Sequence, residues 1–163
     1  MSNQKKTLAA ADFVALHNHT HYSLLDGLQK VVPMVERVKE LGMEAVAITD
    51  HGTLSGAIEL YKEATARGIK PVIGMETYVA ARQHTDREPS KDKQNYHLIL
   101  IAMNMIGYQN LMQLSTIANL EGFYYKPRID HDLLEKYNEG LIVLSACIGG
   151  EVGDALRQGQ YEH

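Results

Sequence analysis

The sequence has 163 residues with no tryptophan, two phenylalanines, four prolines and one cysteine, Cys147. A single cysteine excludes an internal disulfide framework and is typical of a reducing compartment, so we expect a cytoplasmic protein. The sequence also lacks an apolar run near the roughly 20 residues that a membrane-spanning helix needs, so we expect no membrane partner. Residues 1–7 are polar with two lysines, which is unlike a secretion signal.

An excess of positive charge is absent too, since 16 Lys and Arg against 20 Asp and Glu give a net charge of −4. This balance excludes a broad basic surface for duplex nucleic acid, but it does not exclude a nucleic-acid substrate bound through metal ions. Hydrophobic residues at 45% and charged residues at 22% are values of a globular chain. One domain with a sizeable core is therefore expected.

Strand-like and helix-like segments alternate along the chain. Short apolar runs predict strands at 13–16, 45–48, 71–79, 96–102 and 141–145, the first of them buried. Amphipathic stretches predict helices at 30–41, 55–67, 107–120, 130–137 and 151–158. The alternation predicts an α/β fold with a parallel sheet of about five strands. Residues 1–11 are expected to be a flexible lead-in, and residues 83–95 a mobile polar loop.

Two histidines follow the first predicted strand at a spacing of two residues, which places His17 and His19 on one face of it. His51 follows the second strand, Glu76 lies on the third, and Cys147 follows the fifth. The C-terminal ends of strands are where α/β proteins place their chemistry. Imidazole, carboxylate and thiolate ligands gathered there are typical of a zinc or manganese site.

His97 is the exception, because it opens the fourth predicted strand instead of following it. That strand is therefore either antiparallel or begins earlier. Three candidates near the other strand ends have a second explanation. Asp26 or Asp50 can stabilise a turn, and Cys147 can be a small buried apolar residue.

Other polar residues are less specific. His84, His131 and His163 lie in polar or terminal settings and are expected on the surface, whereas His21 could reach the site from its loop. Lys126 and Arg128 belong either to a solvated loop or to a phosphate clamp that binds substrate.

Five runs of residues resemble the PHP (polymerase and histidinol phosphatase) domain at the start of bacterial DNA polymerase III alpha subunits. They are LHNHT at 16–20, SLLDG at 23–27, TDHG at 49–52, GIKPVIGME at 68–76 and EGFYYKPRID at 121–130. The HxH pattern is shared by all PHP proteins, including phosphoesterases, whereas the last run is specific to the polymerase branch. The resemblance covers nearly the whole chain, from Phe13 to Glu151.

The resemblance implies a distorted (β/α)7 barrel, of which residues 12–163 would be the N-terminal portion and the five predicted strands a part. It implies up to three divalent metal ions, with ligands at His17, His19, Asp26, His51, Glu76, His97 and Cys147. His17, His19 and His51 would then be catalytic. Further ligands, an Asp and a His, and the polymerase domains are expected beyond residue 163, so the chain alone is expected to be inactive.

For the intact protein the resemblance implies a DNA-directed DNA polymerase of DNA replication. Its PHP site would act as a metal-dependent 3′→5′ proofreading exonuclease on a DNA 3′ end. The remaining polymerase domains and the replisome subunits would be its partners. Two alternatives stay open: a stand-alone PHP phosphoesterase, and a non-catalytic, metal-stabilised scaffold for the polymerase.

Overall fold

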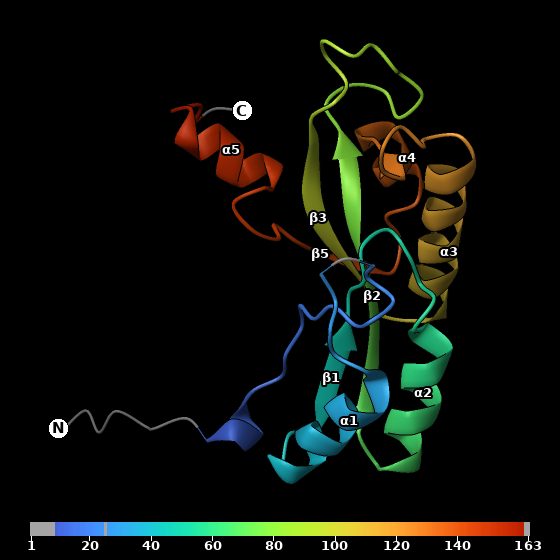
Figure 1. The fold of residues 1–163 in the computed structure, drawn as a ribbon, viewed down its shortest axis with the longest axis vertical. Helices are drawn as coiled ribbons and strands as arrows, with labels where there is room; N and C mark the ends of the chain where they lie inside the picture. The colour runs from blue at the N-terminus through green and yellow to red at the C-terminus, as the bar shows by residue number, and fades with distance from the viewer. Residues whose placement is uncertain (1–8, 25, 162–163) are drawn as a thin grey trace, which may run out of the picture.

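The computed structural model describes residues 9–24 and 26–161 and confirms an α/β fold with one mixed sheet of five strands (Figure 1). The strands are β1 (Ala45–Ile48), β2 (Lys70–Ala80), β3 (Asn95–Ala102), β4 (Arg128–Ile129) and β5 (Leu141–Leu144). The helices are the short 3-10 helix η1 (Ala10–Asp12), α1 (Val31–Glu40), α2 (Ala57–Ala66), α3 (Met105–Leu120), α4 (His131–Lys136) and α5 (Glu151–Arg157). The predicted lead-in falls mostly on residues 1–8, which lie outside the described residues.

Strand β2 joins the two halves of the molecule (Figure 1). Its first part, from Lys70 to Ile73, pairs in parallel with β1, and its second part, from Gly74 to Ala80, pairs antiparallel with β3. Strand β5 is antiparallel to β3, and the two-residue β4, which the sequence did not predict, lies parallel beside the end of β2.

The prediction of a parallel sheet is therefore wrong for β3 and β5, although for β3 the antiparallel alternative that His97 indicated is confirmed. A parallel return needs a crossover, usually a helix, whereas the segment between β2 and β3 contains only turns and bends and brings the chain back antiparallel. The antiparallel course also explains His97, since the start of β3 lies beside the end of β2, with His97 opposite Tyr78.

Two apolar cores cover the sheet. Helices α1 and α2 bury Val35 and Leu60 against β1, and helix α3 buries Leu111 and Leu114 against β2 and β3. Met75 of β2 belongs to the second core. Because side chains alternate along a strand, its neighbours in sequence project from the opposite face of β2.

The predicted buried strand at 13–16 is wrong. Only Ala15 forms a bridge, to Val46 of β1, and Phe13, Val14 and Leu16 are exposed. The segment is extended and lies along β1, but no described element covers its outer side. Apolar character alone therefore did not produce a buried strand here.

Arg128 of β4 holds the polar loop between β2 and β3. Its side chain is fully buried, and its guanidinium donates hydrogen bonds to the carbonyl oxygens of Gly122, Asp92, His84 and Asp86 at 2.7–3.2 Å. The loop at 83–95, which the sequence predicts to be mobile, is thus held by hydrogen bonds from a buried side chain. This burial also contradicts the prediction that Arg128 contacts a substrate phosphate, because its donors are taken by carbonyls within the fold.

The three histidines predicted to lie on the surface have different outcomes in the structure. His131 is exposed, as predicted, and its Nε2 lies 2.9 Å from Glu151 Oε2. His84 is wrongly predicted, because its side chain is only 14% exposed and is hydrogen-bonded to Asp130. Asp130 is buried and caps α4, so His84 is held by a structural carboxylate. His163 lies outside the described residues.

We expect Arg128→Met to lower the free energy of unfolding by about 3 kcal/mol, because several buried carbonyls lose their donor. Chemical denaturation of the chain measures the change. Arg37→Met is the control, since Arg37 is exposed and its ion pair within the described residues is to Glu40 on its own helix. It should cost less than about 0.5 kcal/mol. Equal, small effects of both substitutions would contradict the structural role of Arg128.

Candidate metal centre

The candidate metal centre is built around Glu76, in the middle of β2. Its backbone N–H donates to the carbonyl of Asp50 at 3.1 Å, and its carbonyl accepts from Gly52 at 2.9 Å. These bonds attach the segment that follows β1 to one side of β2, while Ile99 of β3 pairs on the other side. The Glu76 carboxylate projects from the face opposite Met75 and is almost fully buried.

The two carboxylate oxygens of Glu76 contact two different groups of side chains. Oε2 lies 2.7 Å from His17 Nε2 and 3.0 Å from His19 Nε2, and these two nitrogens are 3.0 Å apart. Oε1 lies 2.5 Å from His97 Nδ1, which is 3.8 Å from Cys147 Sγ. Within each trio, one ligand atom per residue falls within 4.8 Å of the others. Glu76 is therefore common to two possible metal sites.

His51 and Asp26 complete the cluster. His51 stacks on His19 with ring centroids 4.1 Å apart, and its Nδ1 lies 3.8 Å from Glu76 Oε2. On its other edge, His51 Nε2 is 2.7 Å from Asp26 Oδ2. The structure thus brings all seven residues with predicted ligand positions into one connected group. His21 packs instead against Tyr22.

Asp50 holds the histidine loop in place. This buried carboxylate accepts hydrogen bonds from the Thr20 amide at 2.6 Å, the Thr20 hydroxyl at 2.8 Å and the Ser23 hydroxyl at 2.7 Å. The Ser23 oxygen in turn accepts from the His51 amide at 3.1 Å. Asp50 therefore joins two ligand-bearing loops. The sequence did not predict this role for Asp50, because its partners Thr20 and Ser23 lie about 30 residues earlier in the chain.

The acid–base properties of the centre follow from this contact of one buried carboxylate with several imidazoles. Burial by itself raises the pKa of Glu76, but hydrogen bonds with His19 and His17 and the nearby His51 and His97 outweigh it and lower the pKa to about 2. The hydrogen bond to Glu76 raises the pKa of His19, although burial opposes it. The carboxylate is thus ionised and attracts positive charge to this point.

The donor set fits divalent metal ions. The Nδ1 atoms of His19 and His51 are buried and have no hydrogen-bond partner in the described chain. Several imidazole nitrogens converge on the carboxylate, where either shared protons or metal ions must compensate its charge. Imidazole, carboxylate and thiolate are all established ligand types for transition metals.

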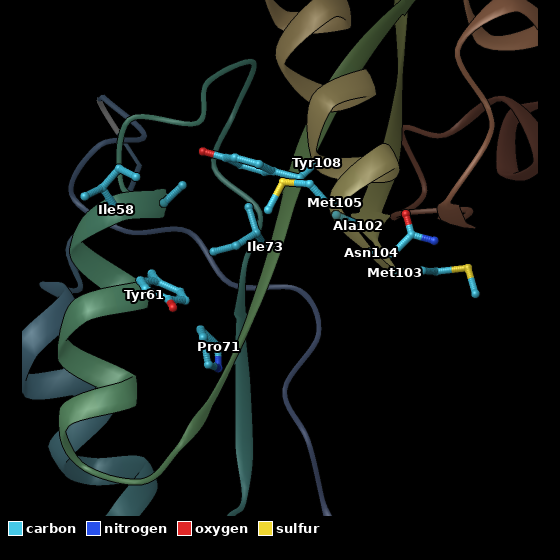
Figure 2. A pocket seen from close by; sticks show the side chains of 10 residues that line it. Ile58, Tyr61, Pro71, Ile73, Ala102, Met103, Asn104, Met105 and Tyr108 are labelled. Atoms are coloured by element: carbon cyan, nitrogen blue, oxygen red, sulfur yellow. The ribbon is translucent and has the colours of Figure 1, made fainter.

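A separate apolar pocket of about 320 Å³ lies between α2 and α3 (Figure 2). Its walls include Ile58 and Tyr61 of α2, Ile73 of β2, and Met105 and Tyr108 of α3. No histidine, cysteine or carboxylate is among the residues that line it. The candidate metal ligands therefore lie in the Glu76 cluster and not at this pocket.

Known proteins are similar in sequence to most of the chain. The family profile described as PHP domain matches residues 15–163. DNA polymerase III subunit alpha of Borreliella burgdorferi is 50% identical over 151 residues, which is 92% of this chain and 13% of that protein. The subunit of Aquifex aeolicus is 54% identical over 145 residues, 85% of this chain and 12% of that protein. The chain therefore spans about an eighth of the length of these relatives.

Among solved structures, an amidohydrolase from Chromobacterium violaceum with bound sulfate and no metal aligns with a TM-score of 0.45 and 21% identity. The alignment covers 62% of this chain and 32% of that chain. Within the described residues, no helix combines the length and the apolar character needed to cross a membrane.

We expect Glu76→Gln to remove metal from both sites at once, because each trio uses this carboxylate. Metal content after dialysis, measured by mass spectrometry, should fall by more than about 10-fold. Cys147→Ser should affect only the His97 site. The matched control is Glu40→Gln on α1, whose exposed carboxylate pairs only with Arg37 in the described chain. Full metal content in Glu76→Gln would contradict the shared role.

In the metal-free chain, acid should weaken the fold through Glu76. Because its folded pKa of about 2 lies below the ordinary 4.5, its contribution is complete above the ordinary value and is lost as the pH falls toward the folded one. The difference in unfolding free energy between the parent chain and Glu76→Gln, with chelator present, should therefore shrink between about pH 5 and pH 2. A difference that is constant over this range would contradict the lowered pKa.

Proposed function

The chain belongs to the PHP domain family, and on that premise we propose that its Glu76 centre holds divalent metal ions for phosphodiester hydrolysis at the 3′ end of DNA. The observation that carries the proposal is the sharing of one buried carboxylate by two trios of ligand-competent side chains. Residues 12–163 would form the N-terminal portion of the domain, in a longer polymerase chain.

His17, His19 and Glu76 would hold one ion, and Glu76, His97 and Cys147 a second. Asp26 and His51 lie at the edge of the first group and would be ligands to a third. Zinc or manganese suits the set, since thiolate and imidazole favour zinc and carboxylate is acceptable to manganese. When bound, such ions supply a nucleophilic water at neutral pH and stabilise the charge on the phosphate and the leaving oxygen.

The solvent exposure of the ligand side chains indicates the side from which a DNA strand would reach the metal centre. The Glu76 side chain is 2% exposed, whereas Asp26 is 56% exposed and His17 is 34% exposed. The cluster therefore opens to solvent on the side of Asp26. In the proposed reaction, water forms the new P–O bond, the bond from phosphorus to the 3′ oxygen of the preceding nucleotide breaks, and that oxygen takes up a proton.

The proposal of DNA as substrate is supported by the similarity to DNA polymerase III alpha subunits. In the intact protein we propose DNA synthesis by other domains of the same chain, contacts with replisome subunits, and a cytoplasmic location. The similarity favours this reading over a stand-alone phosphoesterase acting on a small ester. A purely structural metal centre is the rival that activity measurements must separate.

In the full-length polymerase, replacement of both His17 and His19 by alanine should lower 3′→5′ exonuclease activity by more than about 100-fold and leave nucleotide incorporation intact. Release of labelled 3′ nucleotides from a purified enzyme free of other nucleases measures the effect. His131→Ala, an exposed histidine on α4, is the control.

Unchanged exonuclease activity in the double variant would overturn the proposal. Loss of metal and of thermal stability, from a parent enzyme that has no nuclease activity of its own, would instead establish the scaffold function.

A further inference from the structure

The turn at residues 122–128 lies beside the metal centre and carries an exposed cation, Lys126. We propose that Lys126 binds a backbone phosphate of the strand whose 3′ end enters the centre, next to the phosphate that is cleaved. The substrate class would then be an oligonucleotide and not a small phosphate ester. This inference rests on the proposed function and deepens it.

Tyr78 connects Lys126 to the metal ligands. It lies on β2 two residues after Glu76 and therefore on the same face of the strand. Its ring centroid is 5.8 Å from that of His51 and 5.3 Å from that of His97. The Lys126 ammonium lies 5.1 Å from the same ring. One side chain thus separates the cation from two residues of the centre.

The backbone that carries Lys126 is fixed against the loop that follows β1. Gly52 adopts φ +62°, and a Cβ there would lie 2.6 Å from Cγ of Pro127. This close approach places the turn in contact with Gly52, the residue that follows His51. Within the turn, the Tyr124 amide donates to the Lys126 carbonyl at 3.0 Å. The fold therefore fixes the backbone position of Lys126, while its side chain remains exposed.

The charge of Lys126 is available to a ligand. In the described parts of the chain, no carboxylate lies within ion-pair distance of its Nζ. The side chain beside the ammonium, Tyr78, is a phenol and carries no formal charge. An ammonium with neutral protein neighbours at the rim of a metal centre suits a phosphate that the metal ions do not themselves contact.

The neighbouring side chains favour a nucleic-acid strand. Phe123 and Tyr125 are 52% and 67% exposed, and Tyr125 has the left-handed φ of 59° that is uncommon outside glycine. Exposed aromatic rings beside a cation are the combination with which proteins bind single strands, through base stacking and phosphate contact. A small phosphate ester would need neither ring.

The test compares Lys126→Met and Lys126→Arg in the full-length polymerase. With a single-stranded oligonucleotide, Lys126→Met should raise KM about 10-fold, change kcat by less than about 2-fold, and reduce the salt dependence of binding by about 0.7 in the log–log slope. Lys126→Arg should stay close to the parent. With thymidine 5′-(p-nitrophenyl phosphate), which has one phosphodiester and no neighbouring phosphate, both variants should match the parent.

Lys136→Met is the matched control, because Lys136 lies 5.1 Å from the Tyr137 ring in the same geometry but on α4. An equal rise in KM for both substrates, or an equal effect of Lys136→Met, would overturn the inference. If the parent enzyme cleaves neither substrate, the proposed function fails separately. Fluorescence anisotropy with a phosphorothioate oligonucleotide then decides, and unchanged affinity in Lys126→Met would overturn phosphate binding.

Discussion

The buried carboxylate of Glu76 is the constraint on which the centre depends. A charge removed from water is costly unless opposite charge or hydrogen bonds compensate it. Here His17, His19 and His97 approach the two oxygens directly, and the pKa of Glu76 is lowered despite its burial. Such a site remains ionised and requires positive charge, supplied either by protons on the imidazoles or by metal ions. This requirement links the fold of the sheet to the chemistry that we propose.

The course of β2 makes the constraint possible. Its first half is parallel to β1 and its second half antiparallel to β3, so the segment that follows β1 and the middle of β3 pair on either side of Glu76. Four separate segments therefore place side chains around one carboxylate. They carry His17 and His19, His51, His97 and Cys147. Asp50 adds the remaining support by holding the Thr20–Ser23 loop against the segment that follows β1.

Much of this arrangement was predictable, because local patterns determine helices and strand ends. The helices at 31–40, 57–66, 105–120 and 151–157 lie within two residues of their predicted bounds. The seven residues to which the resemblance assigned ligand positions lie in one cluster. Strand direction was not predictable from the apolar runs, since they indicate burial but not the partner strand; only the position of His97 suggested an antiparallel course, for β3. Arg128 and His84 were placed wrongly for a related reason. Their burial depends on carbonyls and a carboxylate far along the chain, which no local pattern reveals.

We propose that the Glu76 carboxylate is shared by two metal sites. Anomalous diffraction at the absorption edge of the metal, from crystals of the chain grown with zinc or manganese, is the decisive test. We expect one anomalous peak within ligand distance of Glu76, His17 and His19, and a second within ligand distance of Glu76, His97 and Cys147. Peaks that lie elsewhere, with the Glu76 carboxylate bound only to protein, would contradict it.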